Sequence, residues 1–135
     1  MFLLDTNVCV EIIRGRPDHV RERFRRHVKA GHEIFISTIT SFELWYGAEK
    51  SDHPEANRKK TEFFLNGPLA LLEFDEEDSR AAGSIRARLE LEGRMIGPFD
   101  TLLAGQALRR NLILVTGNTR EFSRIHGLQT ENWNR

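Results

Sequence analysis

The chain has too few cysteines for structures that require several cysteine side chains. Its single cysteine, Cys9, excludes an intrachain disulfide and a zinc site made of several cysteines. No apolar run approaches the roughly 20 residues that a membrane helix requires, so no part of the chain is expected to enter a membrane. A basic leader before an apolar stretch is missing from the N-terminus as well. These absences predict a protein of the cytoplasm.

The chain also lacks a net charge. Twenty Lys and Arg side chains balance twenty Asp and Glu side chains, so the overall charge gives no sign of a nucleic-acid partner. The segment 14–29 differs, because it holds seven basic residues against two acidic ones. A length of 135 residues, with 39% hydrophobic and 30% charged residues, is typical of one soluble globular domain. We therefore expect a single domain over residues 1–135.

Short apolar runs alternate along the chain with segments that have helical spacing. Four runs indicate strands buried on both faces of a parallel sheet: Phe2–Leu4, Ile34–Ser37, Leu69–Phe74 and Leu112–Thr116. Between them, apolar stripes at helical spacing are formed by Val20, Phe24 and Val28; by Phe42, Trp45 and Tyr46; by Ala82, Ile85 and Leu89; and by Phe99, Leu102, Leu103 and Ala107. Because strands and helices alternate, the expected fold is a three-layer α/β/α domain around a central, mostly parallel sheet.

Three carboxylates stand in otherwise apolar segments. Asp5 directly follows the first apolar run, Glu43 lies early in the helical stretch after the second, and Asp100 lies just behind Pro98 at the start of another helical stretch. A buried carboxylate costs free energy unless it is hydrogen-bonded, paired with a cation or bound to a metal. Open parallel sheets bind ligands outside the carboxyl ends of their strands, where all three acids are expected. Together they predict one acidic pocket for a hard divalent cation.

Two further polar residues follow the fourth apolar run. Asn118 and Glu121 are expected at the same edge of the sheet as the three acids. Taken singly, two of the acids have an ordinary structural interpretation, Asp5 as a helix cap and Asp100 as an acid favoured by the helix dipole. Glu43 is harder to explain in this way, because its neighbours are apolar. The coincidence of three acids at equivalent positions favours a shared site over separate caps.

Four segments carry these residues in a fixed order along the whole chain. They are Leu4–Asn7; Ser37–Thr40 with Glu43–Leu44 and Gly47–Ala48; Gly97–Ala104; and Val115–Phe122. In order and spacing they resemble the motifs of PIN-domain ribonucleases of the VapC toxin family, the toxic half of bacterial type II toxin–antitoxin pairs. One position departs from the pattern. Many members carry an aspartate where this chain has Asn118, and Glu121 is the neighbour that could replace its charge.

The resemblance implies RNA cleavage that depends on Mg²⁺ or Mn²⁺. Asp5 and Asp100 would bind the metal, Glu43 would complete the cluster directly or through water, and Asn118 would be the fourth catalytic group. One metal or two fit such a set, because Mg²⁺ usually takes only one or two carboxylates. Three hydroxyls could support these ligands or serve as ordinary caps and strand ends, those of Thr6, Ser37 and Thr116.

RNA can lie against an acidic pocket only if cations are nearby. The arginines that could contact phosphates are Arg14, Arg16, Arg86, Arg88 and Arg94. The alternative is that they lie on solvated helix faces with acidic partners, such as Arg86 with Glu90. Trp45 and Tyr46 could stack on bases, or belong to a core or an interface. The resemblance implies initiator tRNA cut in its anticodon loop, with ribosomal RNA as the other open substrate.

The same resemblance implies three partners: an inhibitory antitoxin of the VapB type, a second copy of the chain in a homodimer, and operator DNA reached only through the antitoxin. Phe42, Trp45 and Tyr46, with apolar residues of the segment 6–14, could line a groove for an apolar antitoxin segment. An arginine of the antitoxin could pair with the acids and shut off cleavage.

Two other functions stay open. The first is a non-catalytic subunit of a DNA-binding complex that regulates its operon, with the acids purely structural. Metal-dependent RNA cleavage by the chain alone would separate this function from a ribonuclease. The second is a phosphatase with an aspartate nucleophile, against which the chain lacks a second aspartate two residues after Asp5.

Overall fold

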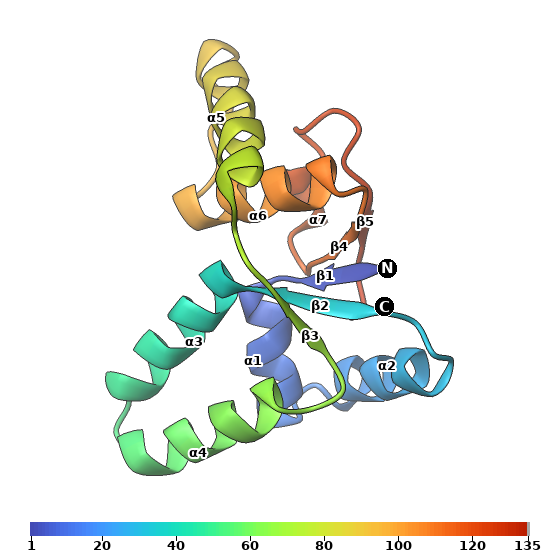
Figure 1. The fold of residues 1–135 in the computed structure, drawn as a ribbon, viewed down its shortest axis with the longest axis vertical. Helices are drawn as coiled ribbons and strands as arrows, with labels where there is room; N and C mark the ends of the chain where they lie inside the picture. Colours follow the sequence, from blue (N-terminus) through green and yellow to red (C-terminus); the bar gives the residue numbers. More distant parts are fainter. Residues whose placement is uncertain (135) are drawn as a thin grey trace.

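Five short strands form one sheet in the computed structural model, which describes residues 1–134. Every strand pair in these residues is parallel, and the order across the sheet is β3-β2-β1-β4-β5 (Figure 1). The strands are β1 (Phe2–Leu4), β2 (Ile34–Ser37), β3 (Ala70–Leu72), β4 (Ile113–Val115) and β5 (Thr130–Glu131). The predicted end of the domain at Arg135 lies outside the described residues.

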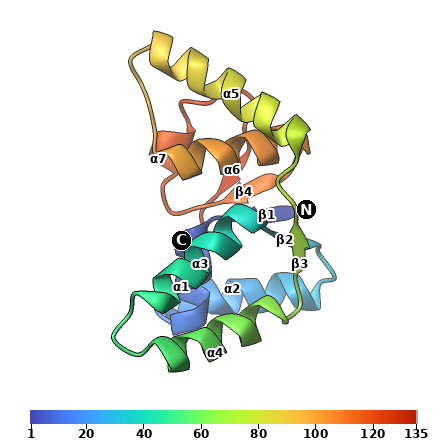
Figure 2. The ribbon, with the colours of Figure 1, turned by 60° about the vertical axis from the view of Figure 1, so that its left-hand side comes forward.

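Helices cover both faces of this sheet (Figures 1 and 2). On one face lie α1 (Thr6–Arg14), α2 (Asp18–Lys29), α3 (Thr38–Glu49) and α4 (Pro54–Leu65). On the other lie α5 (Glu76–Leu91), α6 (Pro98–Arg109) and the short α7 (Thr119–Phe122). The prediction of a three-layer α/β/α fold is therefore confirmed. Within residues 1–134, no helix has the length and apolar character needed to cross a membrane.

Alternation along the strands divides the apolar side chains between two cores. Phe2 and Leu4 of β1 belong to the core under α1–α4, whereas Leu3 belongs to the core under α5–α7. β2 and β4 alternate in the same way, which explains why the central strands are apolar at nearly every position. Burial of one such leucine contributes about 1.5–3 kcal/mol. Both layers therefore anchor the strands whose ends carry the polar residues of interest.

The outer strands differ from the sequence-based expectation. The run Leu69–Phe74 predicts a strand buried on both faces, but β3 is shorter, and its Ala70 and Leu71 are exposed. The reason is that β3 is the outermost strand beside β2. At the opposite edge, β5 was not predicted, because a strand of two residues is too short to show a period.

The aromatic stripe of α3 is also placed differently. The spacing of Phe42, Trp45 and Tyr46 predicts a buried helix face, but Phe42 and Tyr46 are 55% and 56% exposed. Phe99 of α6, which belongs to another predicted stripe, is 40% exposed. The face that α3 buries carries smaller or aliphatic residues, namely Thr40, Leu44 and Ala48.

The order of the strands reverses beside β1. From β1 the chain moves outward to β2 and β3, and then β4 pairs with the other edge of β1. Such a reversal leaves a crevice outside the carboxyl ends of the two strands, where open α/β sheets bind ligands. Leu4 pairs with Val115 at these ends, and the backbone N–H of Asp5 donates to the Val115 carbonyl at 3.0 Å. The fold therefore places Asp5 at the crevice.

Candidate metal centre

Asp5 is a buried carboxylate held by fixed donors. It caps α1, its Oδ1 accepts the N–H of Val8 at 2.9 Å, and only 5% of the residue is exposed. Burial raises the pKa of Asp5 to about 6; hydrogen bonds from the Thr116 hydroxyl and the Val8 amide oppose this rise, and the charge of Asp100 adds to it. The same side chain is therefore a helix cap and an acid whose ionised form a nearby cation would stabilise.

Glu43 is tied to the helix that Asp5 caps. Thr6, the first residue of α1, donates from Oγ1 to Glu43 Oε1 at 2.6 Å. The Thr6 hydroxyl also lies 3.2 Å from the hydroxyl of Thr40, which is fully buried on α3. These contacts join α1 to α3 beside the acids and fix the direction of the Glu43 carboxylate.

Asp100 connects the acids of the two layers. It lies in the first turn of α6 and is half-buried. Burial raises the pKa of Asp100, and the negative charges of Glu121 and Glu43 raise it further. Asp100 also raises the pKa of Asp5. One side chain of α6 thus lies within electrostatic reach of acids from α3, from α7 and from the end of β1.

Asn118 and Glu121 lie together after β4. The Asn118 side chain donates from Nδ2 to Glu121 Oε2, and the Asn118 backbone N–H donates to Thr116 Oγ1 at 3.0 Å. Thr116 has no exposed surface and also bonds Asp5. An ionised aspartate at position 118 would have no donor for Glu121. The amide that departs from the family pattern therefore orients the neighbouring carboxylate.

Carboxylate oxygens are the ligands that Mg²⁺ and Mn²⁺ favour in proteins, so the chemistry of this donor set fits a hard cation. A divalent cation would also offset the repulsion that raises the pKa of Asp5 and Asp100. Within residues 1–134, no group of three or more His, Cys, Asp or Glu side chains is already arranged to hold a metal ion. The acids are therefore close enough for their charges to interact, but they do not form a preformed metal site.

The remaining predicted hydroxyl, Ser37, is a cap. Its Oγ accepts the N–H of Ile39 at 3.1 Å, and the residue has no exposed surface. This geometry corresponds to the ordinary capping role, and it positions the start of α3 at Thr38, five residues before Glu43.

A groove of about 550 Å³ extends from Glu43 between α1, α3 and α4. Its apolar walls include Val10, Ile13, Leu44 and Ala48, and the basic residues that line it are Arg14, Arg16, Lys50 and Lys60. Val10 and Ile13 of the segment 6–14 line this groove, whereas Phe42, Trp45 and Tyr46 do not, because α3 faces it with Glu43, Leu44, Gly47 and Ala48. Which surface an antitoxin segment would occupy stays a prediction.

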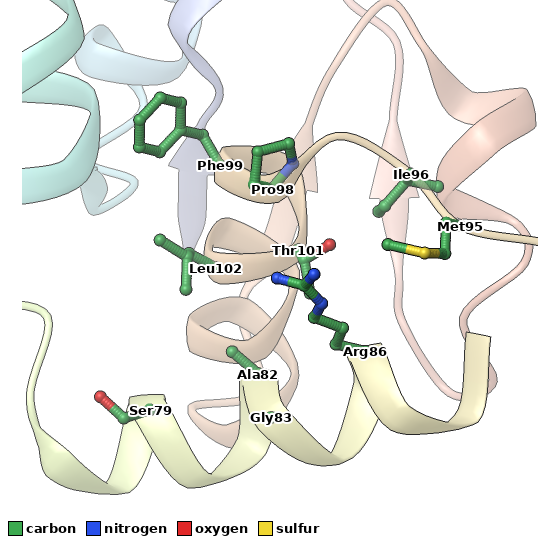
Figure 3. A pocket seen from close by; sticks show the side chains of 10 residues that line it. All are labelled: Ser79, Ala82, Gly83, Arg86, Met95, Ile96, Pro98, Phe99, Thr101 and Leu102. Carbon is green, nitrogen blue, oxygen red and sulfur yellow. The ribbon is translucent and has the colours of Figure 1, made fainter. Parts of the chain in front are cut away.

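The other predicted arginines lie apart from this groove. Arg86, Arg88 and Arg94 are exposed, and Arg86 forms the expected pair with Glu90 at 3.0 Å. Arg86 also lines a second hollow of about 450 Å³ between α5 and α6, whose walls are mostly apolar (Figure 3). Within residues 1–134, no hydrogen bond or ion pair joins these three arginines to Asp5, Glu43 or Asp100, and the pair with Glu90 supports the interpretation of a solvated helix face for Arg86.

Comparison with known proteins assigns the family. The chain matches the model of the PIN domain over residues 2–128. It is 47% identical to the tRNA(fMet)-specific endonuclease VapC of Shigella flexneri over 132 residues, and this matched stretch covers 98% of this chain and 97% of that protein. The chain is a PIN-domain ribonuclease of the VapC toxin family.

Solved structures of the VapC family share the fold. The structure of VapBC2 from Rickettsia felis, bound to a DNA fragment from their promoter, matches with a TM-score of 0.90 and 37% identity over 98% of both chains. DNA-bound VapBC from Salmonella typhimurium matches with a TM-score of 0.89 and 44% identity, over 98% of this chain and 97% of that one. The predicted membership in a toxin–antitoxin family is therefore confirmed.

In this VapC-family ribonuclease, sequence reasoning missed a buried charge cluster away from the crevice. Asp78 of α5 has no exposed surface, and it accepts from Arg109 at 2.9 Å and from Arg110 at 3.0 Å. Asp75 caps α5 in a reciprocal capping box with Asp78. The spacing of Asp75 and Asp78 and the adjacent Arg109–Arg110 pair were the available signals. The cluster joins the start of α5 to the end of α6.

Proposed function

We propose that this VapC-family ribonuclease cleaves its RNA with a divalent cation, Mg²⁺ or Mn²⁺, held by Asp5 and Asp100 with Glu43. The observation that carries the proposal is the meeting of these acids, from both layers, at the reversal of strand order. When bound, the cation lowers the pKa of a water molecule and offsets charge on the phosphate. Asn118 would be the fourth group of the site.

Each protein group in this proposal has a distinct task. The Val8 amide and the Thr116 hydroxyl hold the Asp5 carboxylate in place after β1, where it would bind the cation. Thr6 holds Glu43, which is positioned to accept a proton or to bind water beside the phosphate. Asn118 directs Glu121 toward the same cluster. These tasks need both the α1–α3 layer and the α6–α7 layer to be docked.

The proposed substrate is initiator tRNA, cut in its anticodon loop. Support comes from the Shigella flexneri and Salmonella typhimurium relatives, which are tRNA(fMet)-specific endonucleases 47% and 44% identical to this chain. Ribosomal RNA is the alternative substrate. Sequencing of 5′ ends after brief induction separates the two, because cuts would collect either in the anticodon loop or in ribosomal RNA. A site of action in the cytoplasm follows from either RNA.

The test of the metal site is cleavage of purified initiator tRNA by partner-free protein. Asp5→Ala and Asp100→Ala should each reduce Mg²⁺-dependent cleavage by more than about a hundredfold while the domain stays folded. The matched control is Asp18→Ala, which removes an exposed acid from the first turn of α2 and should cleave normally. Unchanged cleavage by Asp5→Ala protein would overturn the metal site. Absence of cleavage in the wild-type chain would favour the non-catalytic alternative.

The amide at position 118 is tested separately. Because Asn118 donates to Glu121, Asn118→Asp should release the Glu121 carboxylate and add a negative charge. The Mn²⁺ affinity measured by calorimetry should therefore stay the same or increase. Weaker Mn²⁺ binding by this variant would show that the amide itself is required.

We also propose that a small VapB-type antitoxin restrains the enzyme and carries operator DNA binding for both. The DNA-bound VapBC structures of Rickettsia felis and Salmonella typhimurium support this partner. The groove that begins at Glu43 offers an apolar segment a place to fold on binding, and an antitoxin arginine could reach the acids from there. The single-domain chain would act as a homodimer.

Co-expression with the neighbouring short open reading frame tests the partner. It should rescue growth and give a multi-chain complex in light scattering that cleaves RNA more slowly than the free chain. A complex that cleaves RNA as fast as the free chain would contradict inhibition. A chain that stays monomeric and does not bind the protein encoded by the neighbouring reading frame would contradict both the homodimer and the antitoxin complex.

A further inference from the structure

The last strand of the sheet is fastened to α2 by side chains. β5 consists of Thr130 and Glu131, and its backbone hydrogen bonds to β4 alone would hold so short a strand weakly. Glu131 Oε1 accepts the indole N–H of Trp133 at 2.9 Å and an N–H of Arg23 at 3.0 Å. Trp133 is 1% exposed, and its ring stacks on the His27 ring with centroids 4.8 Å apart and planes 13° from parallel. We call Arg23, His27, Glu131 and Trp133 the C-terminal latch.

The C-terminal latch acts on the strand that leads to the proposed metal site. β4 lies between β1 and β5, so these two neighbours determine where its carboxyl end lies (Figure 1). The latch contacts both neighbours, because Glu131 belongs to β5 and the Phe2 ring of β1 meets the Trp133 ring edge to face, with centroids 5.5 Å apart. The Glu131 carbonyl accepts the N–H of Thr116, the residue after β4, at 3.0 Å. Glu131 therefore binds α2 with its carboxylate and the end of β4 with its carbonyl.

Thr116 transmits this position to the site. It has no exposed surface, and its hydroxyl bonds the Asp5 carboxylate and accepts the Asn118 N–H at 3.0 Å. On its other side, the Asp5 carboxylate is held by the Val8 N–H at 2.9 Å. A shift of the Thr116 backbone would lengthen both bonds of its hydroxyl, and the Asp5 carboxylate would then be free to turn.

We propose that Glu131 is a positioning residue for the metal site: with the C-terminal latch it fixes Thr116, and through Thr116 it fixes the Asp5 carboxylate. The inference rests on the proposed function, since Asp5 is a proposed metal ligand. Removing a group that orients a metal ligand typically lowers metal affinity or activity by about ten- to a hundredfold. Glu131 acts one residue further from the metal, so we expect the lower end of this range. An ordinary ion pair at the edge of a sheet would change stability alone.

Cleavage of initiator tRNA by partner-free protein tests the proposal. Glu131→Ala should lower kcat and the Mn²⁺ affinity measured by calorimetry by about tenfold each, with less than about a twofold change in KM for the RNA. Glu131→Gln keeps an oxygen that accepts from Trp133 and Arg23, so it should retain kcat within about threefold. Asp78→Asn is the matched control, because it breaks a buried ion pair between α5 and α6. It should lower the melting temperature and leave kcat unchanged. An equal loss of kcat in Asp78→Asn would overturn the proposal, since lost stability would explain both results.

The route through Thr116 is tested by a double variant. Thr116→Val removes the hydroxyl and should lower kcat by about ten- to a hundredfold. Because Glu131 acts through this hydroxyl, adding Glu131→Ala to Thr116→Val should lower kcat by less than a further factor of about two. A loss in the double variant equal to the product of the two single losses would show that Glu131 acts by another route, and it would overturn the proposal.

The Val8 amide reports on the Asp5 carboxylate without metal or RNA, because it donates to Asp5 Oδ1. In amide NMR spectra of the metal-free chain, its signal should shift in Glu131→Ala, return in Glu131→Gln and stay in place in Asp78→Asn. A Val8 signal that does not move in Glu131→Ala refutes the proposal, and so does a kcat equal to that of the wild-type chain. If the wild-type chain neither cleaves RNA nor binds Mn²⁺, the proposed function fails, while the Val8 signal still decides whether Glu131 positions Asp5.

Discussion

Asp78 is a buried carboxylate that is stabilised in its ionised form by two arginines. Burial raises its pKa, but hydrogen bonds from Arg110, from the Asp75 amide and from Arg109 outweigh that effect and bring the pKa down to about 2. Gln106 Nε2 adds a contact at 3.3 Å. Because the folded pKa lies below the ordinary value of about 4, ionised Asp78 stabilises the fold.

Asp78→Asn should lower the free energy of unfolding at pH 7 by about 2 kcal/mol, because two arginines lose their charged partner. The stabilisation in the wild-type chain is complete above the unfolded pKa near 4 and is lost as pH falls through about 2. Urea titrations should therefore show a gap between the two proteins that narrows below pH 4. The exposed acid Glu77, changed to Gln, is the control in the same helix. A gap independent of pH would refute the charge as its cause.

Helices α5 and α6 meet backbone to backbone at Gly105. A Cβ at this position would lie 2.6 Å from the Ala82 nitrogen and 2.8 Å from its Cβ. Gly105→Ala should therefore separate the helices and destabilise the fold by about 1–3 kcal/mol in thermal denaturation. Gly83→Ala is the matched control, because a Cβ there meets nothing within 4 Å in a helix interior. It should be neutral or stabilising by up to about 1 kcal/mol. Equal melting temperatures for both variants would contradict this packing.

Local sequence patterns predicted where the helices and strands lie. Contacts between residues far apart in the sequence determine which of their side chains are buried. The range of α1 follows from Asp5 as a cap, and the central strands follow from their unbroken apolar runs. The exposure of Leu71 depends on the position of β3 at the edge of the sheet, which no local pattern contains. The same holds for the site. The proximity of Asp5 and Asp100 was predicted by placing both at strand ends, but only Asp5 follows a strand, because α6 comes after helix α5. The contacts of Thr6 with Thr40 and Glu43 depend on how α1 packs on α3.

Folding and cation binding should be coupled across the whole molecule. Burial and neighbouring acids raise the pKa of Asp5 to about 6, so without a cation the stability falls as pH rises through 6. Millimolar Mn²⁺ should raise the melting temperature at pH 7.5, and the increase should shrink below pH 6, where Asp5 is protonated. Asp5→Ala should lose the response without being less stable in metal-free buffer at pH 7.5, because removing a buried charge and its repulsion by Asp100 offsets loss of the cap on α1. A melting temperature of the wild-type chain indifferent to Mn²⁺ at pH 7.5 would count against linkage.

The position of Asp100 also has a consequence for synthesis on the ribosome. Asp5 and Glu43 come from the first third of the chain, but Asp100 begins α6 and Asn118 follows β4, the strand that completes the centre of the sheet. A nascent chain that has exposed only α1–α4 holds two of the three proposed acids, and β1 has one open edge. The proposed metal site is therefore incomplete until α6 and β4 have been made, whereas the groove between α1, α3 and α4 is encoded well before them. An inhibitor translated from the same message could meet its groove before the nuclease is complete.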